Sequence, residues 1–156
     1  MDALERTIAR WVKNSRGLDA KLFINGPAFA AYPTPTILVT SPDCGPSLST
    51  FEINYTEDGD GLFPTLTWTL PPTINASDVV EYVLVVEDAD APLGSTPALH
   101  GAVYHIPTNK IEITQSDLER VRGQKGELKG GLQYAQTLTG AVYGAPRPLR
   151  GHGPHR

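Results

Sequence analysis

The sequence predicts a mainly β protein of antiparallel strands with one helix at its N-terminus. Its 156 residues include 14 prolines and 15 glycines, a composition that favours short strands and turns over a helical bundle. Apolar segments with strand-like patterns, separated by these turn formers, recur along the middle of the chain. At this length we expect a single domain, covering residues 1–156.

The N-terminal helix is predicted within residues 1–17, because residues 2–15 have helical periodicity and Gly17 follows them. Its apolar residues fall on one stripe, formed by Leu4, Ile8, Trp11 and Val12. We expect this stripe to pack on the body of the protein, with Trp11 as a packing anchor rather than a ligand-stacking aromatic.

Four segments are predicted to be strands. Residues 37–40 form a short apolar run, and residues 61–70 alternate apolar and polar side chains before two prolines. Residues 81–87 are mostly β-branched and aliphatic, which fits a central strand buried on both faces. Residues 102–107 form the next strand, and residues 116–122 are expected to make one or two helical turns after it.

The composition argues against several classes of function. The formal net charge of -4 and the pI near 5.5 disfavour a nucleic-acid partner. No apolar stretch has the length of a membrane span, and the N-terminus lacks an apolar signal core. Cys44 is the single cysteine, so no disulfide can form within the chain. These features predict a cytoplasmic protein.

An acidic loop follows the strand predicted at residues 81–87. Asp88 and Asp90 are two residues apart, so in extended backbone their carboxylates face the same side. Such a pair can donate and accept protons, or it can cap backbone amides in a tight turn before Pro92. Both interpretations are open at this point. His100 opens the following strand and can face this loop.

The histidines raise the alternative of a metal site. All four lie in or near the same regions of the chain, as His100, His105, His152 and His155. His152 and His155 are separated by Gly153 and Pro154 in irregular backbone, without the helical spacing of a zinc-binding pair. We therefore predict no metal and no cofactor. His105 is expected to face away from His100 and to be structural.

The last segment of the chain, residues 143–156, is laced with glycine and proline and is expected to be irregular. Unpaired amides in such a segment can converge on an anion as a nest. Arg147, Arg150 and Arg156 add charge suited to phosphate or carboxylate. The alternative is a solvated basic loop without a ligand.

Three motifs resemble the phosphatidylethanolamine-binding protein family, and its fungal members in particular. The motifs are Glu87-Asp88-Ala89-Asp90-Ala91-Pro92, Leu99-His100-Gly101 and Gly151-His152-Gly153-Pro154-His155-Arg156. The likeness extends over about residues 61–156. It implies two antiparallel sheets and a small pocket that accepts the phosphate or carboxylate of a small ligand or a lipid head group.

The resemblance also implies which residues form the ligand site. They are Asp88, Pro92, His100, Gly144, Pro146 and His155, with Asp90 bracing the loop. Ala89 stands where the family commonly has proline. The family continues beyond the position of Arg156 with two strands and a helix, so a C-terminally incomplete domain is expected. Its exposed sheet edges are expected to favour self-association or a complementing chain.

Three functions are compatible with these residues. The first is binding of a small anionic ligand, without covalent chemistry. The second is a fungal biosynthetic enzyme for secondary metabolites, in which Asp88 and His100 are the acid-base pair that assists cyclisation or dimerisation of polyketide-derived acids or anhydrides. The third is a regulatory protein that binds a partner, as the kinase-inhibitor relatives do.

Overall fold

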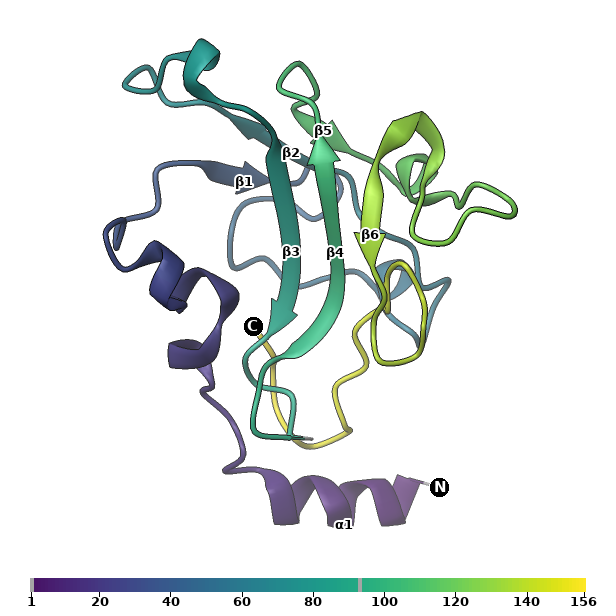
Figure 1. Ribbon diagram of the computed structural model, residues 1–156. Helices are drawn as coiled ribbons and strands as arrows, with labels where there is room; N and C mark the ends of the chain where they lie inside the picture. The colour runs from purple at the N-terminus through teal and green to yellow at the C-terminus, as the bar shows by residue number, and fades with distance from the viewer. Residues whose placement is uncertain (1, 93) are drawn as a thin grey trace.

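Two three-stranded antiparallel sheets form the body of the protein (Figure 1). The computed structural model describes residues 2–92 and 94–156. One sheet has the strand order β1-β2-β5 and the other β3-β4-β6. Their bounds are β1 Leu38–Thr40, β2 Leu66–Thr69, β3 Tyr82–Asp88, β4 Ala98–Ile106, β5 Glu112–Ile113 and β6 Gln133–Ala135. The predicted mainly β, two-sheet antiparallel fold is confirmed.

The core lies where the two sheets meet, and both contribute to it. Trp68 of β2 contacts Tyr82 of β3 edge to face, with ring centroids 5.4 Å apart. Ile106 and Ile113 are fully buried, and they come from β4 and β5. The other buried members are Phe63, Val103, Leu118, Leu128, Leu132, Tyr134 and Val142. Burial of these apolar side chains is the main source of stability for the fold.

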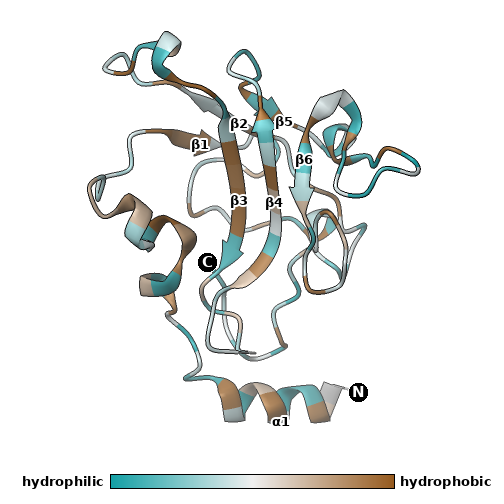
Figure 2. Cartoon of the chain, viewed as in Figure 1, coloured by the Kyte–Doolittle hydropathy of each residue, from teal (hydrophilic) through white to brown (hydrophobic). Residues whose placement is uncertain are grey.

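The strand β3 lies at an edge of its sheet, so the prediction of a central strand for residues 81–87 is wrong. Among the described strands, only β4 pairs with it. Apolar residues follow one another along β3 (Figure 2). Such a run indicates that the side chains of a strand can be buried, but it does not indicate how many strands pair with the backbone of that strand. Val83 is 53% exposed, so β3 is not buried on both faces either.

The helix α1, Asp2–Val12, lies apart from the two sheets (Figure 1). The expected packing of its apolar stripe is wrong, since Leu4 is 69% and Trp11 is 89% exposed. The helix instead meets the body through buried Ala9 and through Glu5, whose carboxylate accepts the backbone N–H of Arg150 at 3.3 Å. No helix in the described part of the chain is long and apolar enough to cross a membrane.

The strand predicted at residues 61–70 is shorter in the structure because side chains satisfy its first backbone groups. The N–H of Phe63 donates to Gln115 Oε1 at 2.6 Å, and the N–H of Thr65 donates to Asp43 Oδ2 at 2.7 Å. These bonds take the place of ladder pairing, so β2 starts at Leu66.

The remaining helical elements are short 3-10 turns. The turn expected near residues 116–122 is one of these, at Gln115–Leu118. The others are Asp19–Lys21, Phe23–Asn25, Pro27–Phe29, Ile53–Tyr55, Ala76–Asp78 and Lys129–Gly131.

Truncation of the core should be costly at Ile106. We expect Ile106→Ala to lower the free energy of unfolding by about 2–5 kcal/mol, because a fully buried side chain leaves a cavity. Leu138→Ala is the control, since Leu138 is 96% exposed and should change stability by less than about 0.5 kcal/mol. Urea denaturation followed by circular dichroism measures both; equal effects of the two substitutions would contradict this view of the core.

Candidate functional site

Asp88 is the centre of a cluster where the end of β3 meets the C-terminal segment. Asp88 is buried, with 7% of its surface exposed. One carboxylate oxygen, Oδ1, accepts the N–H of Asp90 at 2.7 Å, and Oδ2 accepts His155 Nδ1–H at 2.6 Å. His100 Nε2 lies 3.9 Å from the same Oδ2. That separation is an electrostatic contact rather than a hydrogen bond.

His100 is fixed by a reciprocal pair of hydrogen bonds to Gly144. Its ring Nδ1 donates to the Gly144 carbonyl at 2.5 Å, and the Gly144 N–H donates to the His100 carbonyl at 2.7 Å. The ring therefore presents Nε2, and not Nδ1, to other groups. The side chain is 18% exposed. The imidazole of His100, which belongs to β4, is thus oriented by its hydrogen bond to the C-terminal segment.

Burial and charge act in opposite directions on Asp88 and His100. Burial raises the pKa of Asp88, but the imidazoles of His100 and His155 outweigh it and hold that pKa below its usual range. The Asp88 carboxylate raises the pKa of His100, against burial, which lowers it. The pair therefore favours an ionised carboxylate beside a protonated imidazole.

Asp90 is almost fully buried, at 1% exposure, and joins three segments of the chain. Arg156 Nε donates to its Oδ2 at 3.0 Å, the Gly17 N–H donates to Oδ1 at 3.1 Å, and Arg16 Nη2 lies 3.4 Å from Oδ2. Arg156 above all holds the pKa of Asp90 far below its usual range. Asp90 therefore braces the loop through Arg156, the neighbour of His155.

His152, which the sequence analysis did not place in the site, lies behind His155. It is 4% exposed, and its Nδ1 is 2.8 Å from His155 Nε2. Gly153 between them has φ of 105°, and an added Cβ would lie 2.7 Å from Arg16 Nη1. The positive φ favours glycine here, whereas the Arg16 side chain could move aside for a Cβ. The spacing of the two histidines around glycine and proline was the available sequence signal.

Several predicted site residues are not joined to the cluster. Among the described residues, no hydrogen bond ties Pro92 or Pro146 to the side chains of Asp88 or His100. The Pro146 carbonyl instead accepts the N–H of Glu57 at 3.2 Å. Arg147, offered as a source of positive charge, pairs at the surface with Asp58 at 3.6 Å.

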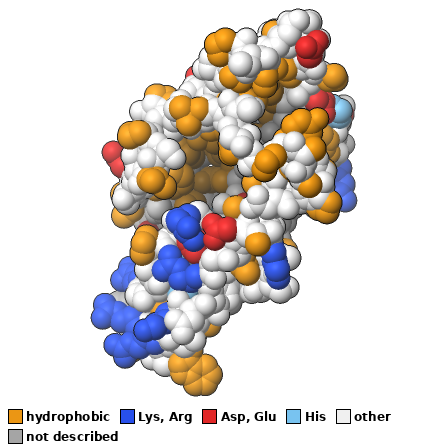
Figure 3. Space-filling model, turned by 90° about the vertical axis from the view of Figure 1, so that its left-hand side faces the viewer, with side chains coloured by type: hydrophobic (Ala, Val, Ile, Leu, Met, Phe, Trp, Pro, Cys, Tyr) orange, Lys and Arg blue, Asp and Glu red, His pale blue; other side chains and the backbone are white. Residues whose placement is uncertain are grey.

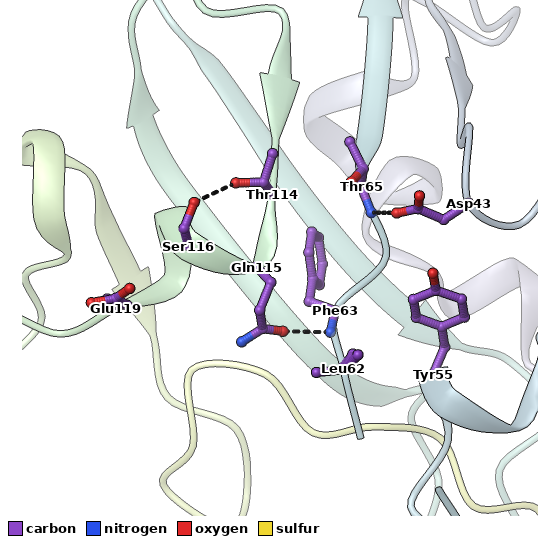
Figure 4. A pocket seen from close by; sticks show the side chains of 9 residues that line it. All are labelled: Asp43, Tyr55, Leu62, Phe63, Thr65, Thr114, Gln115, Ser116 and Glu119. Atoms are coloured by element: carbon purple, nitrogen blue, oxygen red, sulfur yellow. Dashed lines mark hydrogen bonds between the residues drawn. The ribbon is translucent and has the colours of Figure 1, made fainter. Parts of the chain in front are cut away.

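A cavity of about 480 Å³ lies elsewhere in the protein (Figure 4). Its lining residues are Asp43, Tyr55, Leu62, Phe63, Thr65, Thr114, Gln115, Ser116 and Glu119. None of them belongs to the predicted ligand site. Within residues 2–92 and 94–156, no group of three or more potential ligand side chains is placed to hold a metal ion.

A two-sheet antiparallel fold with an acidic loop facing a histidine and a Gly-His-Gly-Pro-His-Arg tail defines a class of proteins. Residues 42–156 match the phosphatidylethanolamine-binding protein family, and the chain belongs to this family. A solved relative, a phosphatidylethanolamine-binding protein homologue from Chlamydia trachomatis, superposes with a TM-score of 0.51 at 18% identity. The superposition covers 74% of this chain and 67% of the chain from Chlamydia trachomatis.

Two fungal relatives are more similar in sequence. Both are named phomoidride biosynthesis cluster protein B; one comes from Talaromyces stipitatus and the other from a further fungal species. They are 42% and 39% identical over 98% of this chain. The chain spans 62% of the length of the first and 72% of the second.

The buried carboxylate of Asp90 should contribute strongly to stability. We expect Asp90→Asn to lower the free energy of unfolding by about 1.5–3 kcal/mol at neutral pH, because charge-assisted bonds to two arginines are lost. Asp58→Asn is the control, since Asp58 is half-exposed and its pair with Arg147 is worth little.

The same substitution has a predicted pH dependence. The pKa of Asp90 is lowered in the folded protein, so its stabilising effect is present above the unfolded pKa of about 3.9 and is lost as the pH falls below it. Urea unfolding at a series of pH values should show the two proteins converging in acid. A constant difference down to the most acidic samples would contradict this assignment.

Proposed function

We propose that the protein binds a small anionic ligand, with a phosphate or carboxylate head group, beside His100. The observation that carries this proposal is the fixed orientation of His100. Its Nδ1 is committed to the Gly144 carbonyl, so Nε2–H is the donor left for an anion. The raised pKa keeps this imidazole protonated at a higher pH than an ordinary histidine.

The other predicted residues have supporting roles in this proposal. Asp88 keeps the His100 imidazole charged, and Gly144 fixes its direction. His155 holds Asp88, and Asp90 holds the tail through Arg156. Pro92 and Pro146 limit the conformations of the two loops, as the family resemblance implies for the walls of the site.

A second candidate is an enzyme that assists cyclisation or dimerisation of polyketide-derived acids or anhydrides. The names of the two fungal relatives favour it. In this case Asp88 and His100, 3.9 Å apart, would exchange a proton with the substrate. Incubation with candidate polyketide acids, with His100→Ala as control, tests it; no product above the control while the ligand still binds would leave only ligand binding and regulation of a partner protein.

Ligand binding should protect His100 from chemical modification. With phosphate or acetate present, we expect diethyl pyrocarbonate to modify His100 more slowly, because the anion occupies Nε2. His105 is the internal control, since it is exposed and bonds to Glu81 outside the site. Peptide mass spectrometry measures both, and Asp88→Asn should abolish the protection. Equal reactivity of His100 with and without the anion would refute the proposal.

We also propose that the protein self-associates through the free edge of β3. Between Tyr82 and Val86 this edge carries no proline or lysine, the residues that usually block edge pairing. Leu38 of β1 is 68% exposed, and the same side of the molecule shows apolar side chains around a hollow (Figure 3). A second copy presents an identical row of backbone donors and acceptors, and is therefore a matching partner.

A charge placed on the pairing strand tests this proposal. Val83→Lys should weaken association, because a charge would be placed on the pairing strand. Sedimentation velocity over a range of concentrations measures this, with Val80→Lys as a control outside β3. A wild-type protein that stays monomeric throughout would contradict the proposal.

A further inference from the structure

A continuous line of hydrogen bonds connects the end of α1 to Asp88. His152 Nε2 is 3.0 Å from the Val12 carbonyl, and His152 Nδ1 is 2.8 Å from His155 Nε2. His155 Nδ1 is 2.6 Å from Asp88 Oδ2. Both rings are shielded from water, because His152 is 4% exposed and the His155 side chain 9%.

The protons in this line can be counted. The Val12 carbonyl can only accept, so His152 Nε2 carries a proton. The ionised Asp88 carboxylate can only accept, so His155 Nδ1 carries a second. The contact between the two rings needs a third proton, on one nitrogen or the other. Two neutral imidazoles hold two protons, so this arrangement holds one more.

We propose that His152 and His155 form one proton-binding unit that carries a single positive charge, and that His152 is a positioning residue of the anion site. This inference rests on the proposed function and deepens it. The Asp88 carboxylate by itself would repel an anion bound at His100, because its Oδ2 lies 3.9 Å from His100 Nε2. The histidine unit and His100 together carry two positive charges against the one negative charge of Asp88, so the cluster keeps a net positive charge for the ligand.

The other charged groups around the unit are already paired. Arg16 donates to the carbonyls of His152 and Pro154, and its remaining partner is Asp90. Asp90 also accepts a hydrogen bond from Arg156. Of the charged groups in contact with the two rings, Asp88 is the one whose charge the shared proton balances.

The state of the rings can be measured directly in the full chain. Long-range proton-nitrogen NMR of the wild-type protein at neutral pH should show three protonated nitrogens among the four of His152 and His155. The exposed His105 serves as the reference ring. Two protonated nitrogens in the pair would overturn the proposal. This readout needs no ligand, so it remains decisive even if the proposed anion binding fails.

Variants of His152 test its effect on the site, with sulfate as the probe because it keeps its charge over the working pH range. His152→Phe removes both ring bonds, and we expect sulfate binding by calorimetry to weaken about tenfold. His152→Gln can still donate to Val12 and accept from His155, so it should restore part of the affinity. The pH profile of its sulfate binding should differ from that of the wild type, because one ring replaces the two that share the extra proton.

The matched control is His105→Gln, which should leave sulfate binding and its pH profile unchanged. If His152→Phe does not fold, as judged by circular dichroism, the glutamine variant decides the question. A sulfate affinity and pH profile in His152→Gln identical to wild type would overturn the role of His152. Absence of sulfate binding in the wild type would refute the proposed function while leaving the proton count to the NMR measurement.

Discussion

The pairing of two buried carboxylates with the C-terminal segment is the interaction on which the site depends. Asp88 and Asp90 leave the end of β3 at 7% and 1% exposure, and a carboxylate in such surroundings needs a charged or hydrogen-bonding partner. His155 supplies it for one and Arg156 for the other. The backbone follows the same path, since the Ala89 N–H donates to the Arg156 carbonyl. The irregular tail is thereby held against a regular strand.

The N-terminal segment is joined to this arrangement by hydrogen bonds. The Gly17 N–H reaches Asp90, the Leu18 N–H reaches the Ala89 carbonyl, and the Val12 carbonyl accepts from His152. Three segments distant in sequence therefore meet through polar contacts around the acidic loop. This explains how α1 can lie at the margin of the fold with Trp11 exposed and still be connected to the site.

Burial separates the roles of the histidines. His105 sits at the surface beside Glu81, whereas His152 is enclosed and bonded on both ring nitrogens. The sequence does not specify how exposed each ring is, because exposure depends on which segments pack around it. The same holds for Arg147 and Arg156, since both are arginines of the irregular C-terminal segment and differ only in what packs around them. One pairs with Asp58 at the surface, and the other reaches the buried Asp90.

The sequence by itself determined the β class, the positions of the main strands and the motifs that place the chain in its family, because side-chain periodicity, turn formers and short motifs are local properties. Only the tertiary structure decided that β3 is an edge strand and that His152 stands behind His155. It also decided that the stripe of α1 faces away from the core. Each of these depends on contacts between residues far apart in the chain, which no local pattern specifies.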